Sequence, residues 1–91
     1  MTFQEARIAL IALGFSVSPY GIVCFKRTHI GVIEMREFAA HLVLSDPPKS
    51  FLLTPATIHA TMRKVADDLF PIARIPYDDI LDLRILLARD V

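Results

Sequence analysis

The sequence lacks the features that define several common classes of protein. Its 91 residues include a single cysteine, Cys24, so no internal disulfide can form and the fold does not depend on an oxidising compartment. Cys24 lies between two apolar residues, which is typical of a small buried side chain rather than of a nucleophile. Glycine is scarce, and Gly14, Gly21 and Gly31 form no phosphate-binding loop. The serines occur in no nucleophile-elbow context, so we expect a non-enzymatic protein without a cofactor.

Long hydrophobic runs and an excess of one charge are also missing. The longest apolar runs, such as 8–15, are far shorter than the roughly 20 residues that a membrane-spanning helix needs. Glu5 stands where a signal peptide would carry only positive charge. The ten basic and ten acidic residues cancel, which argues against strong non-specific binding to nucleic acid. We therefore expect a soluble, cytoplasmic protein that does not bind membranes.

What the sequence has instead is an unusual share of apolar side chains. Hydrophobic residues make up 54% of the chain and charged residues only 22%, and the mean hydropathy is +0.48. A domain of this size has too much surface relative to its volume to bury all of these side chains. The composition therefore predicts that a partner protein or a second copy covers part of the apolar surface.

The first third of the chain predicts a helix followed by a β-hairpin. Thr2 and Glu5 have the spacing of a capping box, and Gly14 is a typical helix stop. Apolar and polar residues alternate over 15–18, and 22–27 is rich in β-branched and aromatic residues. A turn at 18–21 would join these two strands. Residues 30–34 are expected to add a third strand.

The rest of the chain predicts three more helices. In the segment 34–44, Met35, Phe38, Ala39 and Leu42 have the i, i+3, i+4, i+7 spacing of one helix face. Two prolines in 45–50 indicate a short linker. Thr54 and Pro55 suit the start of a second helix, and the last helix is expected from about Tyr77 to Arg89.

These elements predict a single α+β domain over residues 1–91. The expected order is α-β-β-(β)-α-α-α, with a small antiparallel hairpin or three-stranded sheet packed against about four helices. The proline-containing linker at 45–50 would join the N-terminal and C-terminal halves of the chain without dividing it into two domains.

Three aspartates near the start of the last predicted helix raise the question of a metal site. Asp78, Asp79 and Asp82 form a DDxxD pattern, and Asp78 and Asp82 could bind a divalent cation from one helix face. A diphosphate-handling enzyme needs a large helical cavity and a second acidic motif, which 91 residues cannot build. Acidic side chains are favourable at a helix N-terminus, so we interpret the cluster as structural.

The apolar surplus is expected to emerge at two places. Three large apolar residues follow the predicted linker, and the last predicted helix is apolar around well over half of its circumference. The interface candidates are Phe51, Leu52, Leu53, Ile80, Leu83 and Leu87. We expect a small interaction protein, an adaptor, regulator or inhibitor of a larger bacterial or phage protein, that forms a homodimer through apolar helix surface.

Two alternative functions use other residues. Lys26 and Arg27 on the predicted hairpin, with Arg63 and Lys64 on a predicted helix, could contact nucleic-acid phosphates. The layout helix–Gly–strand–turn–strand followed by 54–69 is similar to the order of elements in small mRNA-cleaving toxins with a double-stranded-RNA-binding-like fold. That resemblance implies a catalytic role for His29. The Gly-Ser-His-type run of those toxins is missing, so the resemblance supplies an alternative only.

Overall fold

The computed structural model describes residues 1–45, 48–69 and 77–88. The elements are helix α1 (Phe3–Leu13), strands β1 (Ser16–Val17), β2 (Ile22–Phe25), β3 (Thr28–Arg36), β4 (Ala39–Ser45) and β5 (Pro48–Leu52), and helices α2 (Ile58–Leu69) and α3 (Tyr77–Ala88). The strands form one sheet in the order β1-β2-β3-β4-β5, with every neighbouring pair antiparallel. The predicted α+β class is therefore confirmed.

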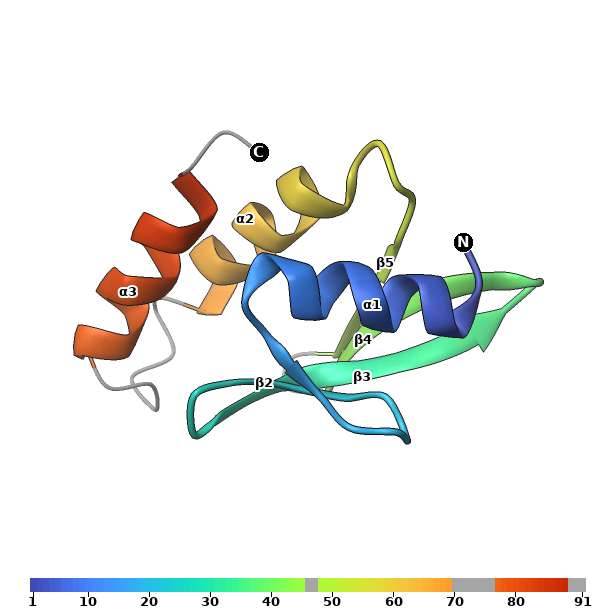
Figure 1. Ribbon diagram of the computed structural model, residues 1–91, viewed down its shortest axis with the longest axis horizontal. Helices are drawn as coiled ribbons and strands as arrows, with labels where there is room; N and C mark the ends of the chain where they lie inside the picture. Colours follow the sequence, from blue (N-terminus) through green and yellow to red (C-terminus); the bar gives the residue numbers. More distant parts are fainter. Residues whose placement is uncertain (46–47, 70–76, 89–91) are drawn as a thin grey trace.

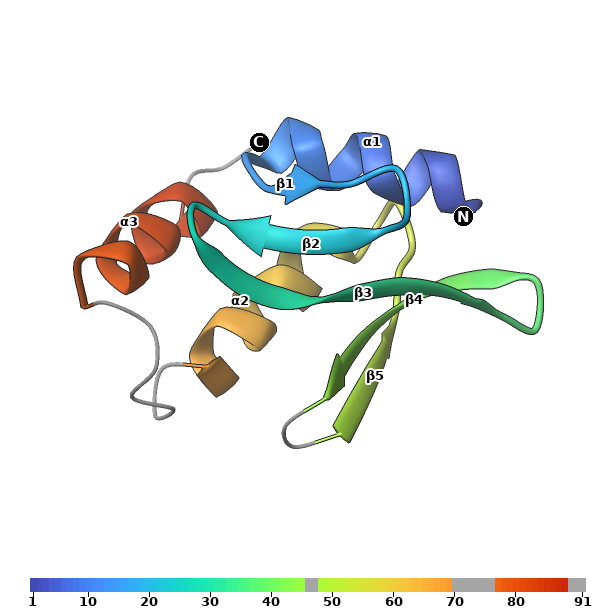
Figure 2. The same ribbon diagram turned by 90° about the horizontal axis from the view of Figure 1, so that it is seen from below.

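Two of the helices cover one face of this sheet. In Figure 1 α1 and α2 lie above the strands, and α3 stands at the end of the sheet beside the turn between β2 and β3. Figure 2, seen from below, shows β2 and β3 in front of α2. The sheet therefore has a face that the helices cover and an opposite face, called the open face below, that no helix of the described chain covers.

The core lies between the helices and the covered face. It is built from alternate strand positions, such as Leu42 and Leu44 of β4, and from the inner faces of the helices, such as Leu10 of α1 and Met62 of α2. Every buried side chain of the described residues is apolar. One apolar layer between helices and sheet is therefore what holds the fold together.

The start and the end of α1 confirm two sequence predictions. The backbone N–H of Glu5 donates to Thr2 Oγ1 at 3.1 Å, and the backbone N–H of Thr2 donates to Glu5 Oε1 at 3.0 Å. Gly14 ends the helix with φ of 109°, in the left-handed region that glycine adopts without strain. These local signals were sufficient because they involve residues close in sequence.

The predicted helix over 34–44 is wrong, because this segment is the hairpin of β3 and β4. Met35 pairs with Ala40, and Arg36 pairs with Ala39. The two turn residues, Glu37 and Phe38, have φ of 52° and 64°. Positive φ at both central positions matches the twist of a two-residue hairpin. The helical spacing of the apolar residues was a coincidence, since in β4 burial alternates with a period of two.

The other differences follow from this hairpin. The sheet has five strands rather than two or three, and the described residues contain three helices rather than four. The predicted linker also contributes to the sheet: Ser45 pairs with Pro48, and Pro48 is the first residue of the edge strand β5, a position that proline tolerates. The two residues between them, and Arg89, lie outside the described part of the chain.

Gly31 is buried in β3 where a side chain would meet the neighbouring strand. A Cβ at Gly31 would lie 2.6 Å from the carbonyl oxygen of Val43 and 2.9 Å from Leu44 Cδ2. Because the first of these atoms is backbone, β3 and β4 would have to separate. We predict that Gly31→Ala lowers the free energy of unfolding by about 1–3 kcal/mol, measured by urea titration. The control, Ser50→Ala at an exposed position of β5, should change it by less than about 0.5 kcal/mol.

The turn residues Glu37 and Phe38 give a second stability prediction. Left-handed backbone costs a non-glycine residue roughly 1–2 kcal/mol. The double substitution Glu37→Asn/Phe38→Gly should therefore raise the free energy of unfolding by about 1 kcal/mol or more. Phe38→Ala, which removes the ring but keeps the backbone cost, should give no comparable gain. A loss of stability in the double variant would show that Phe38 supports the fold.

Candidate functional site

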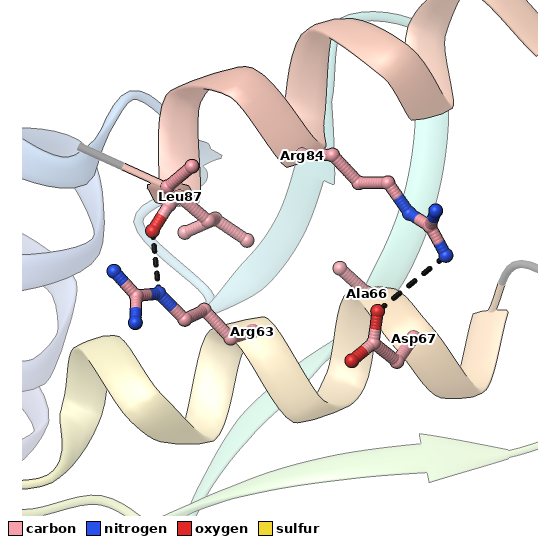
Figure 3. A pocket seen from close by; sticks show the side chains of 6 residues that line it. Arg63, Ala66, Asp67, Arg84 and Leu87 are labelled. Carbon is pink, nitrogen blue, oxygen red and sulfur yellow. Dashed lines mark hydrogen bonds and ion pairs between the residues drawn. The ribbon is translucent and has the colours of Figure 1, made fainter.

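A groove lies on the surface between α2 and α3. It has a volume of about 320 Å³ and is lined by Arg63, Ala66, Asp67, Arg84, Leu87 and Ala88. Figure 3 shows Ala66 in its middle, with one arginine toward each end. The question is whether these charged groups serve a ligand or the fold.

The polar groups of the groove fasten α3 to α2. Arg63 Nε donates to the carbonyl oxygen of Leu87 at 2.6 Å (Figure 3). His59 Nε2 lies 2.7 Å from the same oxygen. A cation near the last carbonyls of a helix interacts favourably with the helix dipole. Farther along, Arg84 and Asp67 form an ion pair at 3.6 Å. These contacts indicate a structural role.

The acidic cluster fastens the other end of α3. Lys26, in the turn between β2 and β3, forms ion pairs with Asp82 and, at 3.4 Å, with Asp79, while Asp78 is exposed. Within the described residues, no three His, Cys, Asp or Glu side chains gather where they could hold a metal ion. The contacts with Lys26 support the structural interpretation of the DDxxD pattern.

The residues of the nucleic-acid alternative are partly committed to these contacts. Lys26 serves Asp79 and Asp82, and Arg63 serves Leu87, whereas Arg27 and Lys64 are exposed. His29 is exposed on β3, opposite Cys24 of β2. The structure thus uses two of the four basic residues to hold the fold rather than presenting them as one patch.

The predicted interface residues also lie mostly inside the chain. Leu53, Leu83 and Leu87 belong to the core, so they present no surface to a partner in this structure. Phe51 is half-buried against the core, and the side chain of Ile80 lies outside the described part. Leu52, at 51% exposed, is the one described member of the set that offers a large apolar surface. Leu83 and Leu87 are covered because α3 packs against α2 and both leucines join the common core.

Part of the apolar surplus lies on the open face of the sheet, and other exposed apolar side chains lie on α1, on α3 and in the turns. Direct cross-strand pairing places Ile22, Val32 and Val43 in one row across β2, β3 and β4, and the row continues to Ser50 of β5. Ile22 is 42% exposed, and Val32 and Val43 are partly exposed. Leu52 lies in the adjacent row, opposite His41. The apolar positions of the open face are thus Ile22, Cys24, Val32, Val43 and Leu52.

The charged residues of the open face are paired with each other. Arg36 donates to Glu34 Oε2 from its terminal nitrogen at 3.0 Å and from Nε at 3.3 Å. The two side chains alternate with the core positions of β3, so they share the face of Val32. The open face therefore combines an apolar row with an internally neutralised ion pair.

The tip of the β3–β4 hairpin carries a second exposed apolar group. Phe38 is 100% exposed, although its backbone is in the left-handed region. The sequence interpretation missed it because helical spacing placed Phe38 on a buried helix face. An alternating interpretation of β4 would have placed Phe38 in the turn.

Comparison with family models, with curated proteins and with solved structures finds no match to this chain. None of the described helices is long and apolar enough to cross a membrane.

The ion pairs of Lys26 with Asp79 and Asp82 predict a dependence of stability on pH. Its hydrogen bond to Asp82, with a smaller contribution from Asp79, raises the pKa of Lys26 above its ordinary value of 10.5. The folded chain binds this proton more tightly than the unfolded chain, so the stabilisation is complete below pH 10.5 and is lost as pH rises through the raised pKa.

We predict that the melting temperature of the wild type exceeds that of Lys26→Met near neutral pH and that the difference disappears at strongly alkaline pH. The difference should also shrink in 1 M salt. The ion pairs are exposed, and the electrostatic screening length falls to about 3 Å at that salt concentration. Lys64→Met is the control, because Lys64 has no ion-pair partner among the described residues. Equal melting temperatures of wild type and Lys26→Met at neutral pH and low salt would show that the ion pairs of Lys26 do not stabilise the fold.

Proposed function

We propose that this chain is a small non-enzymatic protein–protein interaction protein that binds its partner through the open face of its sheet. The observation that carries the proposal is the row of Ile22, Val32 and Val43 with no helix of the described chain over it. An antiparallel sheet with one face in water normally alternates apolar side chains inward with polar side chains outward. Here one outward row is apolar across β2, β3 and β4, beside the outward-facing Glu34 and Arg36 of β3.

Leaving such a row in water has a definite free-energy cost. Burial of apolar surface contributes about 25 cal/mol per Å², so covering a patch of a few hundred Å² would contribute several kcal/mol. Contiguous exposed patches of this kind mark interaction surfaces on soluble domains, whereas isolated exposed apolar residues do not. The cross-strand pairing makes this patch contiguous.

Phe38 supports the same proposal. Its ring adds nothing to the chain's own core, since it is fully exposed, and its backbone conformation is unfavourable for a non-glycine residue. Aromatic side chains supply much of the binding free energy at protein interfaces. A phenylalanine kept at this position suits a contact with another protein.

The open face is less suited to nucleic acid. Sheet surfaces that bind single-stranded nucleic acid stack bases on aromatic side chains and contact phosphates with basic ones. The apolar row here is aliphatic, and Arg36, the arginine beside it, is paired with Glu34. A protein partner is therefore the better match, and an adaptor, regulator or inhibitor would each use the face in the same way.

Site-specific photocrosslinking in cells of the source organism tests the proposal. A photoreactive phenylalanine analogue at Val32 should give an adduct of defined mass, and Val43→Lys in the same chain should remove it. The analogue at Gln4, which is exposed on α1, should not give that adduct. Failure of Val32 to crosslink, or an adduct that survives Val43→Lys, would contradict the proposal.

A further inference from the structure

We propose that the open face binds a second copy of this chain, with the two sheets packed face to face about a two-fold axis. This inference depends on the proposed function of the open face and specifies its partner. It moves self-association from the leucines of α3, which are buried, to the sheet.

The charge balance of the open face favours an identical partner. The open face pairs Glu34 with Arg36 at 3.0 Å, and the whole chain carries ten basic and ten acidic residues. Two copies can therefore approach without net repulsion, and like-charge juxtaposition is what normally prevents self-association. A strongly charged partner would find no complementary field on this face. A surface as neutral and apolar as the open face itself fits it best.

The side chains of the row are also small enough for two sheets to pack closely. The row consists of Ile22, Val32, Val43 and Ser50, which are short or β-branched side chains. Two sheets pack face to face about 10 Å apart, with strand directions about 30° from each other, when their side chains are of this size. Long polar side chains along the row would hold two sheets farther apart. This row thus resembles the inner face of one half of a sandwich, whereas the longer Glu34, Arg36 and His41 lie in the rows nearer the β3–β4 turn.

The area of the open face limits how strong the dimer can be. The four strands β2–β5 are about 19 Å wide at ~4.8 Å per strand, and the nine residues of β3 are about 30 Å long. Because β2, β4 and β5 are shorter, with four, seven and five residues, the footprint is on the order of 400 Å² per copy, about half of the ~800 Å² per partner in a standard interface. That area suits a weak, reversible dimer. Because the chain has its own core on the other face, the monomer should remain folded.

The helix layer is the competing surface, and it is less suitable. Its exposed apolar residues are Ile8, Ile11, Leu81 and Ile85. They come from α1 and α3, two helices that lie near opposite ends of the sequence. No backbone pairing places them in one row, as it does for Ile22, Val32 and Val43. They form one neighbouring pair on each helix, Ile8 with Ile11 and Leu81 with Ile85, and small exposed apolar groups of this kind are ordinary on a protein surface.

Sedimentation equilibrium tests the dimer with matched variants. The purified wild type should show a monomer–dimer equilibrium with a dissociation constant in the micromolar range. Val43→Lys should raise this constant at least ~10-fold, because it brings two ammonium groups into an apolar contact. Ile8→Lys is the matched control: Ile8 is 62% exposed on α1, and the same change there should leave the dimer intact. Circular dichroism should show that both variants are folded.

A gentler variant and an intrinsic thiol complete the test. Val43→Thr keeps the β-branched shape and should weaken the dimer less than Val43→Lys does. Cys24 lies on the open face, so its rate of reaction with Ellman's reagent should fall as the concentration of wild-type chain rises. In Val43→Lys that rate should not depend on concentration.

Three results would overturn the inference. The first is a wild type that stays monomeric at micromolar concentrations with Cys24 reacting at a constant rate. The second is a dimer that Ile8→Lys dissociates and Val43→Lys does not, which would place the contact on the helix layer. The third is a Val32 adduct formed only with a different protein, which would leave the proposed function standing and exclude the second copy.

Discussion

The fold depends on one apolar layer between a sheet and the helices on a single side of it. Leu42 and Leu44 of β4 and Leu10 of α1 belong to that layer, and α3 joins it through Leu83 and Leu87. The described helices supply cover for one sheet face only. The composition nevertheless provides apolar side chains beyond that layer, and Ile22, Val32 and Val43 place some of them in a row on the open face.

The charged side chains determine where α3 lies on this layer and contribute little to the free energy of unfolding. Lys26 holds the start of α3 through Asp79 and Asp82, and Arg63 with His59 holds its last turn through the Leu87 carbonyl. Exposed ion pairs contribute little individually, but contacts at both ends of a short helix determine where it lies on the core. The ion pairs of Lys26 thus account for Asp79 and Asp82, in agreement with the structural interpretation of the acidic cluster.

Sequence reasoning predicted local structure well and long-range structure poorly. The capping box of Thr2 and Glu5 and the stop at Gly14 depend on neighbouring residues, and both were predicted. The β3–β4 hairpin was not, because Glu37 and Phe38 occupy a turn that usually contains Asn-Gly, and because Met35, Phe38 and Leu42 mimic a helical stripe. The candidate surface followed the same pattern: a surplus of apolar residues was evident, but its location required the strand pairing. Burial of Leu83 and Leu87 depends on α2, which contacts them only after folding.

The alternation along β4 has a consequence for how this protein can change. Its even-numbered residues, including Leu42 and Leu44, face the core, and its odd-numbered residues, including Val43, face outward. Inserting or deleting a single residue in this strand would exchange the two sets, sending leucines into water and His41 toward the core. Point substitutions at the outward positions leave the core untouched. Natural relatives should therefore vary in the chemistry of this strand while its length stays constant.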